Sequence, residues 1–239
     1  MKHVFLSLAD AIAPRLCPVC KCSLMRGERL MCMACLAALP RTRMHVRPDN
    51  GIVARLARPG LRLELAAAWM DYSRHSPYAS LIRDAKYRSM PALAREAGRC
   101  FALEMQSDAV AALSDIDVLL PVPVHWTKLL RRGYNQSREA AVGIASVLGV
   151  PVGDNLRALR PHRTQTRRGA SERLHAMKGL FALRASDELR GLHVAVVDDV
   201  VTTGATMAEA LRVLSEAGVR AISVLALAAV RSDEWHFAE

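Results

Sequence analysis

The sequence predicts an α/β fold: a parallel sheet with helices on both faces, preceded by a small four-cysteine module. Three observations carry this prediction. Five of the six cysteines fall between residues 17 and 35. Beyond residue 61, short apolar segments typical of buried strands alternate with longer segments of helical periodicity. One apolar segment, 194–197, runs into two aspartates and a threonine- and glycine-rich loop, as expected at the ligand-binding edge of such a sheet.

Length and composition agree with one medium-sized domain and a small module. The chain has 239 residues, of which 51% are hydrophobic, and a formal net charge of +10. The positive charge is concentrated in two blocks, since residues 1–60 hold 10 basic and 3 acidic residues and residues 121–180 hold 11 and 3. Any binding of a polyanion is therefore expected at these two blocks.

No segment has the length of a membrane span. The longest apolar run, 221–230, is far shorter than the roughly 20 residues that a spanning helix needs. The apolar start of the chain is interrupted by Asp10 and Arg15, which makes it too short for a secretory signal. We therefore expect a cytoplasmic protein without a membrane span.

The cysteines form two C-x-x-C pairs, Cys17–Cys20 and Cys32–Cys35, with 11 residues between them. Two such pairs can supply a tetrahedral set of thiolates, so we expect a structural zinc in a ribbon-like module over 1–45. Iron in a rubredoxin-like site is the competing metal, and disulfides are the third interpretation. Cys22 is expected outside the ligand set.

The remaining elements follow in order along the chain. Residues 46–60 have the composition of a linker, and residues 61–239 form the second domain. Alternating periodicity, helix caps and turn residues predict strands over 61–72, 116–120, 155–159, 193–197 and 221–228. They predict helices over 78–87, 91–105, 136–148, 171–178 and 205–217.

The segment after the strand at 194–197 has the chemistry of a phosphate cradle. Thr202, Thr203 and Thr206 offer hydroxyl donors, and Gly204 lets the backbone approach an anion at the start of a helix. The adjacent carboxylates of Asp198 and Asp199 suit sugar hydroxyls or a Mg²⁺ ion. The alternative is a strand–turn–helix in which these side chains only cap the helix. No Walker loop is present.

Residues 194–206 resemble the phosphoribosyl-diphosphate motif of type I phosphoribosyltransferases. The pattern is four apolar residues, two acids, two more apolar residues and then Thr-Thr-Gly-x-Thr. The resemblance implies a parallel sheet of about five strands, with Asp198 and Asp199 as the catalytic carboxylates on the ribose hydroxyls and, indirectly, on Mg²⁺. It implies a 5′-phosphate site formed by Thr202, Thr203, Gly204, Ala205 and Thr206.

With the cysteine module, nearly the whole chain resembles the ComF family. The agreement extends to the helix ending in Lys86-Tyr87, to Pro121-Val-Pro123 and to Arg132-Gly-Tyr-Asn-Gln136. By resemblance, Lys86 is a candidate cation, and a pyrophosphate loop comprises Val122, Pro123, Val124 and His125, with Arg131 and Arg132. His125 is expected either to donate to a phosphate or to face solvent. A flexible loop carries Arg163, Arg167, Arg168 and Arg173, although its sequence departs from the family pattern near Arg168 and Ala176.

The resemblance implies that the protein binds phosphoribosyl diphosphate and acts in natural transformation. There it would handle single-stranded DNA and pass it to a helicase or a recombination-loading protein. The alternatives are an active metabolic phosphoribosyltransferase, or a regulatory ligand-binding protein, with no DNA role. Nothing in the sequence identifies an acceptor substrate.

Overall fold

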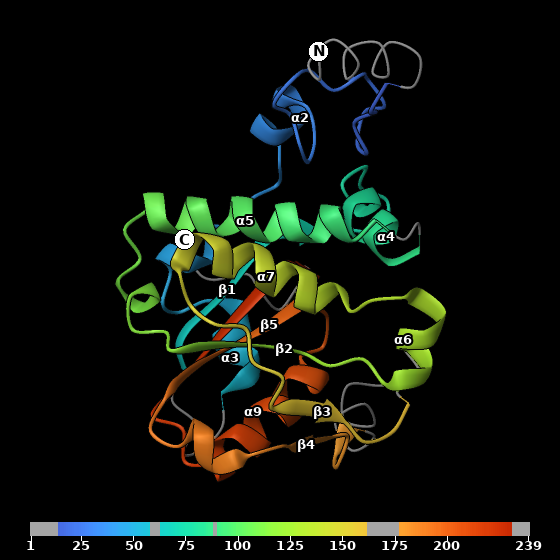
Figure 1. Ribbon diagram of the computed structural model, residues 1–239. Coiled ribbons are helices and arrows are strands. Elements are labelled where there is room, and N and C mark those ends of the chain that lie inside the picture. Colours follow the sequence, from blue (N-terminus) through green and yellow to red (C-terminus); the bar gives the residue numbers. More distant parts are fainter. Residues whose placement is uncertain (1–13, 58–62, 88–89, 162–176, 231–239) are drawn as a thin grey trace, which may run out of the picture.

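The main sheet contains four parallel strands in the order β1-β6-β5-β2 (Figure 1). The computed structural model describes residues 14–57, 63–87, 90–161 and 177–230. The strands are β1 (Leu63–Tyr72), β2 (Val118–Pro121), β5 (His193–Val201) and β6 (Ala221–Val230). Because all of them are parallel, the loops that follow them meet at one edge of the sheet. The predicted α/β class is confirmed.

The apolar content of the central strands reflects burial on both faces. Every residue of β6 except Val230 is buried. A parallel strand covered on both sides has a continuous rather than an alternating apolar pattern. At the outer edge of β2, a single parallel bridge between Leu119 and Val152 extends the described sheet instead of a full fifth strand.

Two long helices cover one face of the sheet and two shorter ones the other (Figure 1). The first pair is α5 (Pro91–Ser107) and α7 (Gln136–Leu148), with α4 (Ala79–Tyr87) against α5. The second pair is α3 (Gly51–Leu56) and α9 (Ala205–Glu216). These layers match the predicted helices except α3, which falls in the expected linker.

The α3 segment is held firmly against the sheet. Asn50 accepts the backbone N–H groups of Ile52 and Val53, which caps the helix, and its Nδ2 donates to the Ala66 carbonyl of β1 at 2.7 Å. Ile52 and Leu56 are buried in the core. The Asn and Gly that gave this stretch the composition of a linker therefore serve as a helix cap and a first helical residue.

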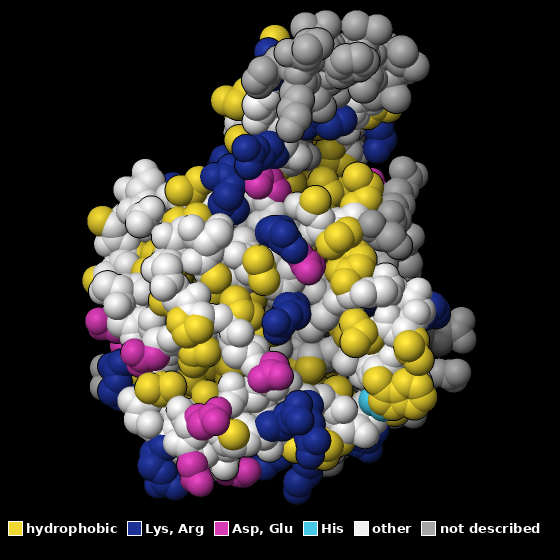
Figure 2. All heavy atoms as spheres, viewed as in Figure 1, with side chains coloured by type: hydrophobic (Ala, Val, Ile, Leu, Met, Phe, Trp, Pro, Cys, Tyr) yellow, Lys and Arg dark blue, Asp and Glu magenta, His cyan; other side chains and the backbone are white. Residues whose placement is uncertain are grey.

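The short helix α6 (Trp126–Arg132) follows β2 and was not expected from the sequence. None of its residues is buried, and Trp126 and Leu130 are 63% and 77% exposed. Hydrophobic side chains are visible on the surface over this helix (Figure 2). Seven residues without a buried face give too weak a periodic pattern to reveal a helix.

The other described elements are small. The strands β3 (Leu156–Ala158) and β4 (Phe181–Leu183) form an antiparallel pair on either side of the segment 162–176. One short helix, α2 (Met33–Ala37), lies in the cysteine module. Three 3₁₀ turns are η1 (Met44–Val46), η2 (Ala111–Leu113) and η3 (Ser186–Leu189). Among the described helices, none is long and apolar enough to cross a membrane.

Candidate functional site

The carboxylate pair lies within the last part of β5. We expected the strand to end at Val197, but its pairing with β6 continues to Val201. Since successive side chains of a strand point to opposite faces, the carboxylates of Asp198 and Asp199 flank the strand. Asp198 accepts a hydrogen bond from the Ser137 hydroxyl at 3.0 Å, and Ser137 belongs to α7. One carboxylate is thereby fixed against the start of a helix.

The turn after β5 leads directly into α9. Gly204 adopts a φ of 76°, in the left-handed region that favours glycine, and it immediately precedes the helix. A Cβ at this position would lie 3.2 Å from side-chain carbons of Arg55 and Leu56. Glycine also has no side chain to cap α9, so the first backbone N–H groups of this helix are suited to an anion. The geometry is compatible with the expected cradle over 202–206.

Arg55 supports this turn and was missed in the sequence. Its guanidinium donates to the backbone carbonyl of Thr202. Arg55 is on α3, which we expected to be a linker, so nothing in its own sequence context indicated this contact. The buried packing of Leu56 beside it fixes α3 under the turn.

The loop after β2 begins beside the end of β5. The Val122 N–H donates to the Val197 carbonyl at 2.8 Å, which continues the ladder between the two strands. The two loops predicted to bind diphosphate and ribose phosphate therefore leave adjacent strands at the same edge.

His125 has a structural position at the start of α6. It is only 8% exposed, so the expectation that it faces solvent is wrong. Its Nδ1 lies 2.9 Å from the Thr127 hydroxyl and accepts the Thr127 N–H, which caps the helix. Capping thus occupies Nδ1, the ring nitrogen nearer the backbone.

The expected diphosphate cations lie at the far end of α6. Arg131 is exposed in its last turn, and Arg132 donates to the Gln136 side chain at 3.2 Å. Both arginines lie in the last turn of α6, at the opposite end of this helix from the loop at 122–125. The sequence did not predict this separation.

Asn135 joins the two loops and was missed as a site residue. Its Nδ2 donates to the Val122 carbonyl at 2.9 Å, and its Oδ1 accepts the Ser137 N–H at the start of α7. Ser137 in turn binds Asp198. The signal available in the sequence was Asn two residues before Ser at a helix start, which is typical of a cap.

The neighbouring residues tie the same helix start to α4. The Tyr134 hydroxyl donates to the Ala85 carbonyl, and the Gln136 amide donates to the same oxygen at 3.4 Å. The segment 132–137 is therefore a junction between α4, the β2 loop and β5.

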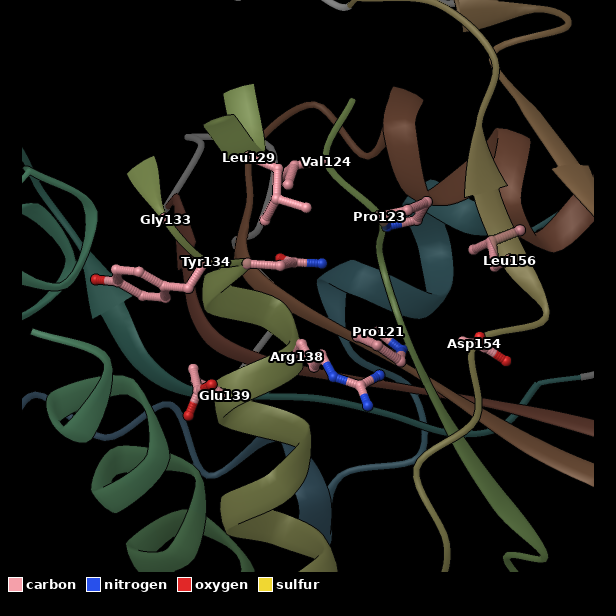
Figure 3. A pocket seen from close by; sticks show the side chains of 11 residues that line it. Pro121, Pro123, Val124, Leu129, Gly133, Tyr134, Arg138, Glu139, Asp154 and Leu156 are labelled. Atoms are coloured by element: carbon pink, nitrogen blue, oxygen red, sulfur yellow. The ribbon is translucent and has the colours of Figure 1, made fainter. Parts of the chain in front are cut away.

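A cavity of about 360 Å³ opens beside this junction (Figure 3). Its apolar wall includes Pro121, Pro123 and Leu156, and the side chains of Arg138 and Asp154 also line it. The volume is at the lower end of the range for small-molecule sites. It adjoins the β2 loop and is not lined by residues of the β5–α9 turn.

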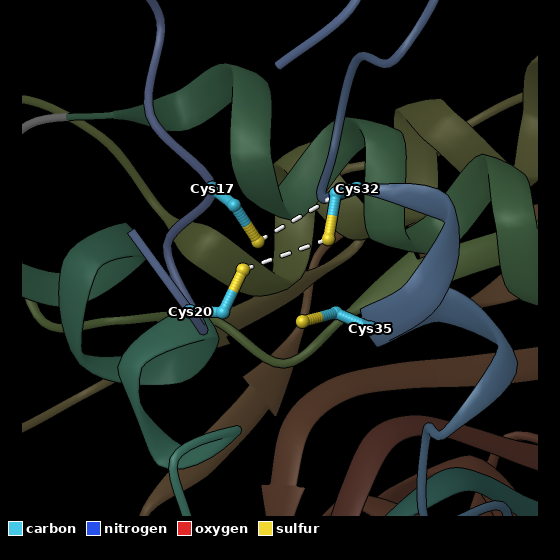
Figure 4. Close-up of side chains that lie close together, drawn as sticks. All are labelled: Cys17, Cys20, Cys32 and Cys35. Atoms are coloured by element: carbon cyan, nitrogen blue, oxygen red, sulfur yellow. Dashed lines mark hydrogen bonds between the residues drawn. The ribbon is translucent and has the colours of Figure 1, made fainter. Parts of the chain in front are cut away.

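The four cysteines of the two C-x-x-C pairs come together, as the spacing predicted (Figure 4). Their sulfur atoms all lie within 4.8 Å of one another, and Cys20 and Cys32 sulfurs are 3.6 Å apart. In a tetrahedron with Zn–S bonds of about 2.3 Å, the sulfurs would be about 3.8 Å apart. The cluster could therefore hold one structural zinc ion.

Backbone contacts prepare these thiols for a metal. The Cys32 N–H donates to the Cys17 sulfur at 3.5 Å. A backbone hydrogen bond from Cys22 lowers the pKa of the Cys20 thiol to about 6, which favours the thiolate that metals bind. The Tyr78 hydroxyl donates to the Cys35 carbonyl at 2.9 Å and so attaches the module to the second domain.

A second group of possible ligands comprises His45, Glu104 and Asp108. Arg41 is paired with Glu104 at 2.8 Å and Arg43 with Asp108 at 3.2 Å, so the carboxylates are already neutralised. The hydrogen bond from His45, with the nearby Arg43, lowers the pKa of Asp108. We assign this group to holding the segment 41–45 against α5.

Several expected site residues lie outside the described part of the chain. These are the flexible-loop arginines Arg163, Arg167, Arg168 and Arg173, together with the side chain of Lys86. Most of the expected helix at 171–178 also lies there.

Comparison with known proteins first gives the class. Residues 135–236 match the phosphoribosyl transferase domain family. A solved glutamine phosphoribosylpyrophosphate amidotransferase from B. subtilis overlaps 56% of this chain at a TM-score of 0.38 and 23% identity. The aligned part is 26% of that enzyme's length. The domain match and the parallel sheet define a phosphoribosyltransferase-type fold.

Relatives of similar length then give the family. The DNA utilization protein YhgH of Salmonella typhimurium is 29% identical over 225 residues, which cover 90% of this chain and 96% of the relative. Competence protein F of Haemophilus influenzae is 36% identical over 115 residues, 47% of this chain and 50% of the relative. These relatives, together with the phosphoribosyl transferase domain match, support the ComF family.

Proposed function

We propose that the turn between β5 and α9 binds phosphoribosyl diphosphate together with Mg²⁺. The observation that carries the proposal is the placement of Asp198 and Asp199 in the last part of β5, the strand that leads through the Gly204 turn into α9. First-turn N–H groups and the Thr202, Thr203 and Thr206 hydroxyls suit the 5′-phosphate. The carboxylates suit the ribose hydroxyls and a magnesium ion.

The neighbouring loop suits the diphosphate of the same ligand. Transfer from ribose C1 depends on positioning and charge stabilisation rather than on a nucleophilic side chain. Asn135 links this loop to the carboxylate side of the site through Ser137. Phosphoribosyl transfer to an acceptor is the activity that this geometry would support.

Replacing both carboxylates tests the assignment. In Asp198→Asn/Asp199→Asn, phosphoribosyl diphosphate should bind at least about tenfold more weakly in the presence of Mg²⁺, because two charged hydrogen-bonding groups are lost. Isothermal titration calorimetry measures the affinity.

The matched control is Asp187→Asn. Asp187 lies on η3 before β5, at the opposite edge of the sheet, and its side chain is 93% exposed. Unchanged affinity in the double variant, or an equal loss in the control, would reject the assignment.

We further propose a role in DNA uptake, which the names of the relatives suggest, with single-stranded DNA as the ligand. One structural observation favours direct binding. The short helix α6 carries the exposed Trp126 together with the cations Lys128 and Arg131, and residues 122–138 contain no acidic side chain. An exposed aromatic ring among cations fits unstacked bases and phosphates. A metabolic transferase without a DNA role is the alternative.

Trp126→Ala tests the nucleic-acid contact. Loss of one stacked base should weaken binding of a labelled single-stranded oligonucleotide by about tenfold or more. Fluorescence anisotropy at two salt concentrations measures this, and affinity should fall with salt because phosphates are neutralised. The control is Leu103→Ala, which removes a 41% exposed apolar side chain from α5.

Two results would contradict the proposed DNA contact. One is the absence of binding by the unaltered protein at low salt. The other is equal affinity in the Trp126 and Leu103 variants, which would remove α6 from the contact.

A further inference from the structure

A fifth thiol lies beside the four-cysteine cluster. The Cys22 sulfur is 3.2 Å from the Cys20 sulfur. A disulfide bond measures about 2.05 Å, so an approach of about 1 Å would join them. Cys20 and Cys22 are exposed, whereas Cys17 and Cys32 are buried. A small reagent from solvent therefore reaches this pair before the buried thiols.

The backbone holds the two exposed thiols together. Lys21, between them, has a φ of 66°, in the left-handed region that non-glycine residues rarely adopt. Its N–H donates to the Cys17 carbonyl at 2.9 Å, and the Cys17 N–H donates to the Cys22 carbonyl at 2.8 Å. The Lys21 ammonium is also fixed, on the Pro18 carbonyl at 2.7 Å. The pair is thus a property of the turn and not of two free side chains.

Cys22 has no place in the metal cluster itself. The four sulfurs that lie within 4.8 Å of one another belong to the two C-x-x-C pairs. Four thiolates complete a tetrahedral zinc site, which leaves Cys22 as an extra thiol beside the ligands Cys20 and Cys32, with the Cys20 sulfur at 3.2 Å. A thiol in contact with an exposed thiolate is the arrangement of a resolving cysteine.

We infer that Cys20 and Cys22 form a disulfide on reaction with a peroxide, a modification site that controls the metal cluster. The Cys20 thiolate attacks a peroxide oxygen; the O–O bond breaks, and a sulfenic acid and hydroxide form. The Cys22 sulfur then attacks the Cys20 sulfur and expels its oxygen as water. In sum, two thiols are oxidised by two electrons, and one hydrogen peroxide is reduced to two waters.

The disulfide would remove one ligand from the cluster. Three thiolates hold zinc less tightly than four, so oxidation releases the ion. The module is joined to the second domain through the Tyr78–Cys35 contact, and Cys35 is one of the remaining ligands. Peroxide would in this way loosen the attachment of the module without touching the β5–α9 turn.

The test uses the full chain, loaded with zinc and treated with hydrogen peroxide. Trypsin cuts after Lys21, so a Cys20–Cys22 bond joins peptide 16–21 to peptide 22–26. Fragmentation between Cys17 and Cys20 in the mass spectrometer then locates the bond. Zinc release is followed with a metal-sensitive dye. Cys22→Ser keeps all four ligands, and Cys100→Ser, on α5, is the matched control.

In the unaltered protein and the Cys100 variant we expect the 16–21/22–26 link and zinc release. Dithiothreitol should then break the link and restore zinc binding. The Cys22 variant should lack this link and should keep a Cys20 sulfenic acid, which dimedone traps. A bond within 16–21, a bond to 30–41, or the absence of a sulfenic acid at Cys20 in the Cys22 variant would overturn the inference. If the protein carries a metal other than zinc, the peptide map alone shows whether the Cys20–Cys22 disulfide forms.

Discussion

At the scale of single residues, two side chains connect parts of the molecule that are far apart in the sequence. Asn135 fixes the β2 loop and caps α7, and Asn50 caps α3 and binds the edge strand β1. Both are asparagines at helix starts, where the amide can accept one hydrogen bond and donate another. A sequence reveals the cap but not the second partner, because that partner is brought close only by the fold.

His193 gives the clearest pH dependence. It is 1% exposed at the start of β5, and its Nε2 lies 2.8 Å from the Ser223 hydroxyl. Burial lowers its pKa below 6.5, and the nearby Arg220 adds to the effect. Above pH 6.5 both the folded and the unfolded chain keep the ring neutral. Below that value the unfolded chain takes up a proton that the folded chain resists, so the free energy of unfolding falls.

We therefore expect the urea concentration at the midpoint of unfolding to decrease as the pH is lowered from 7.5 to 5.5. One proton contributes at most about 1.4 kcal/mol per pH unit. His193→Gln should reduce this slope, whereas His75→Gln, which alters an exposed histidine, should leave it unchanged. A slope that is identical in all three proteins would show that His193 does not contribute.

At the scale of elements, two glycines set the distance between α5 and α7. A Cβ on Gly143 would lie 1.9 Å from the Arg95 carbonyl oxygen, and one on Gly98 would lie 2.2 Å from that of Ala140. Both distances are below any possible contact, so only glycine allows this approach. Since α7 carries Asn135 and Ser137 at its start, the same packing positions the site.

Gly143→Ala should therefore destabilise the fold despite the higher helix propensity of alanine. Overpacking typically costs about 1–3 kcal/mol. Urea unfolding measures the change, and Ser146→Ala on the exposed side of α7 should stay within about 0.5 kcal/mol. A Gly143 variant as stable as the unaltered protein would mean that the two helices can separate freely.

The elements also show what the sequence could predict. Helix α7 begins and ends at the predicted residues, 136 and 148, because an asparagine cap and Gly149 bound an apolar periodic pattern. The strands of the main sheet could be predicted because buried parallel strands are continuously apolar. Helices α3 and α6 were missed, because six or seven residues carry too little periodicity and their stability comes from contacts distant in sequence.

At the scale of the whole molecule, the positive charge divides between regions with different neighbours. The described cations near the β2 loop lie on α6, which also carries the exposed Trp126, and on α7, where Arg138 lines the cavity. The carboxylates lie on the adjacent strand, β5. The resemblance, which rests on local motifs, correctly indicated the fold, and the relatives support the family that it named. The contacts of Arg55 and Ser137 could not be read from it, because they depend on how distant elements pack.

The segment 40–42 has a consequence for self-association. It runs antiparallel to β1, with hydrogen bonds from Thr42 to the Trp69 carbonyl and from Asp71 to the Pro40 carbonyl. An open edge strand is a template on which another chain can add a strand and begin aggregation. Residues 40–42 therefore occupy the hydrogen-bonding edge of β1 at 69–71, where they prevent a second copy of the chain from pairing with the strand.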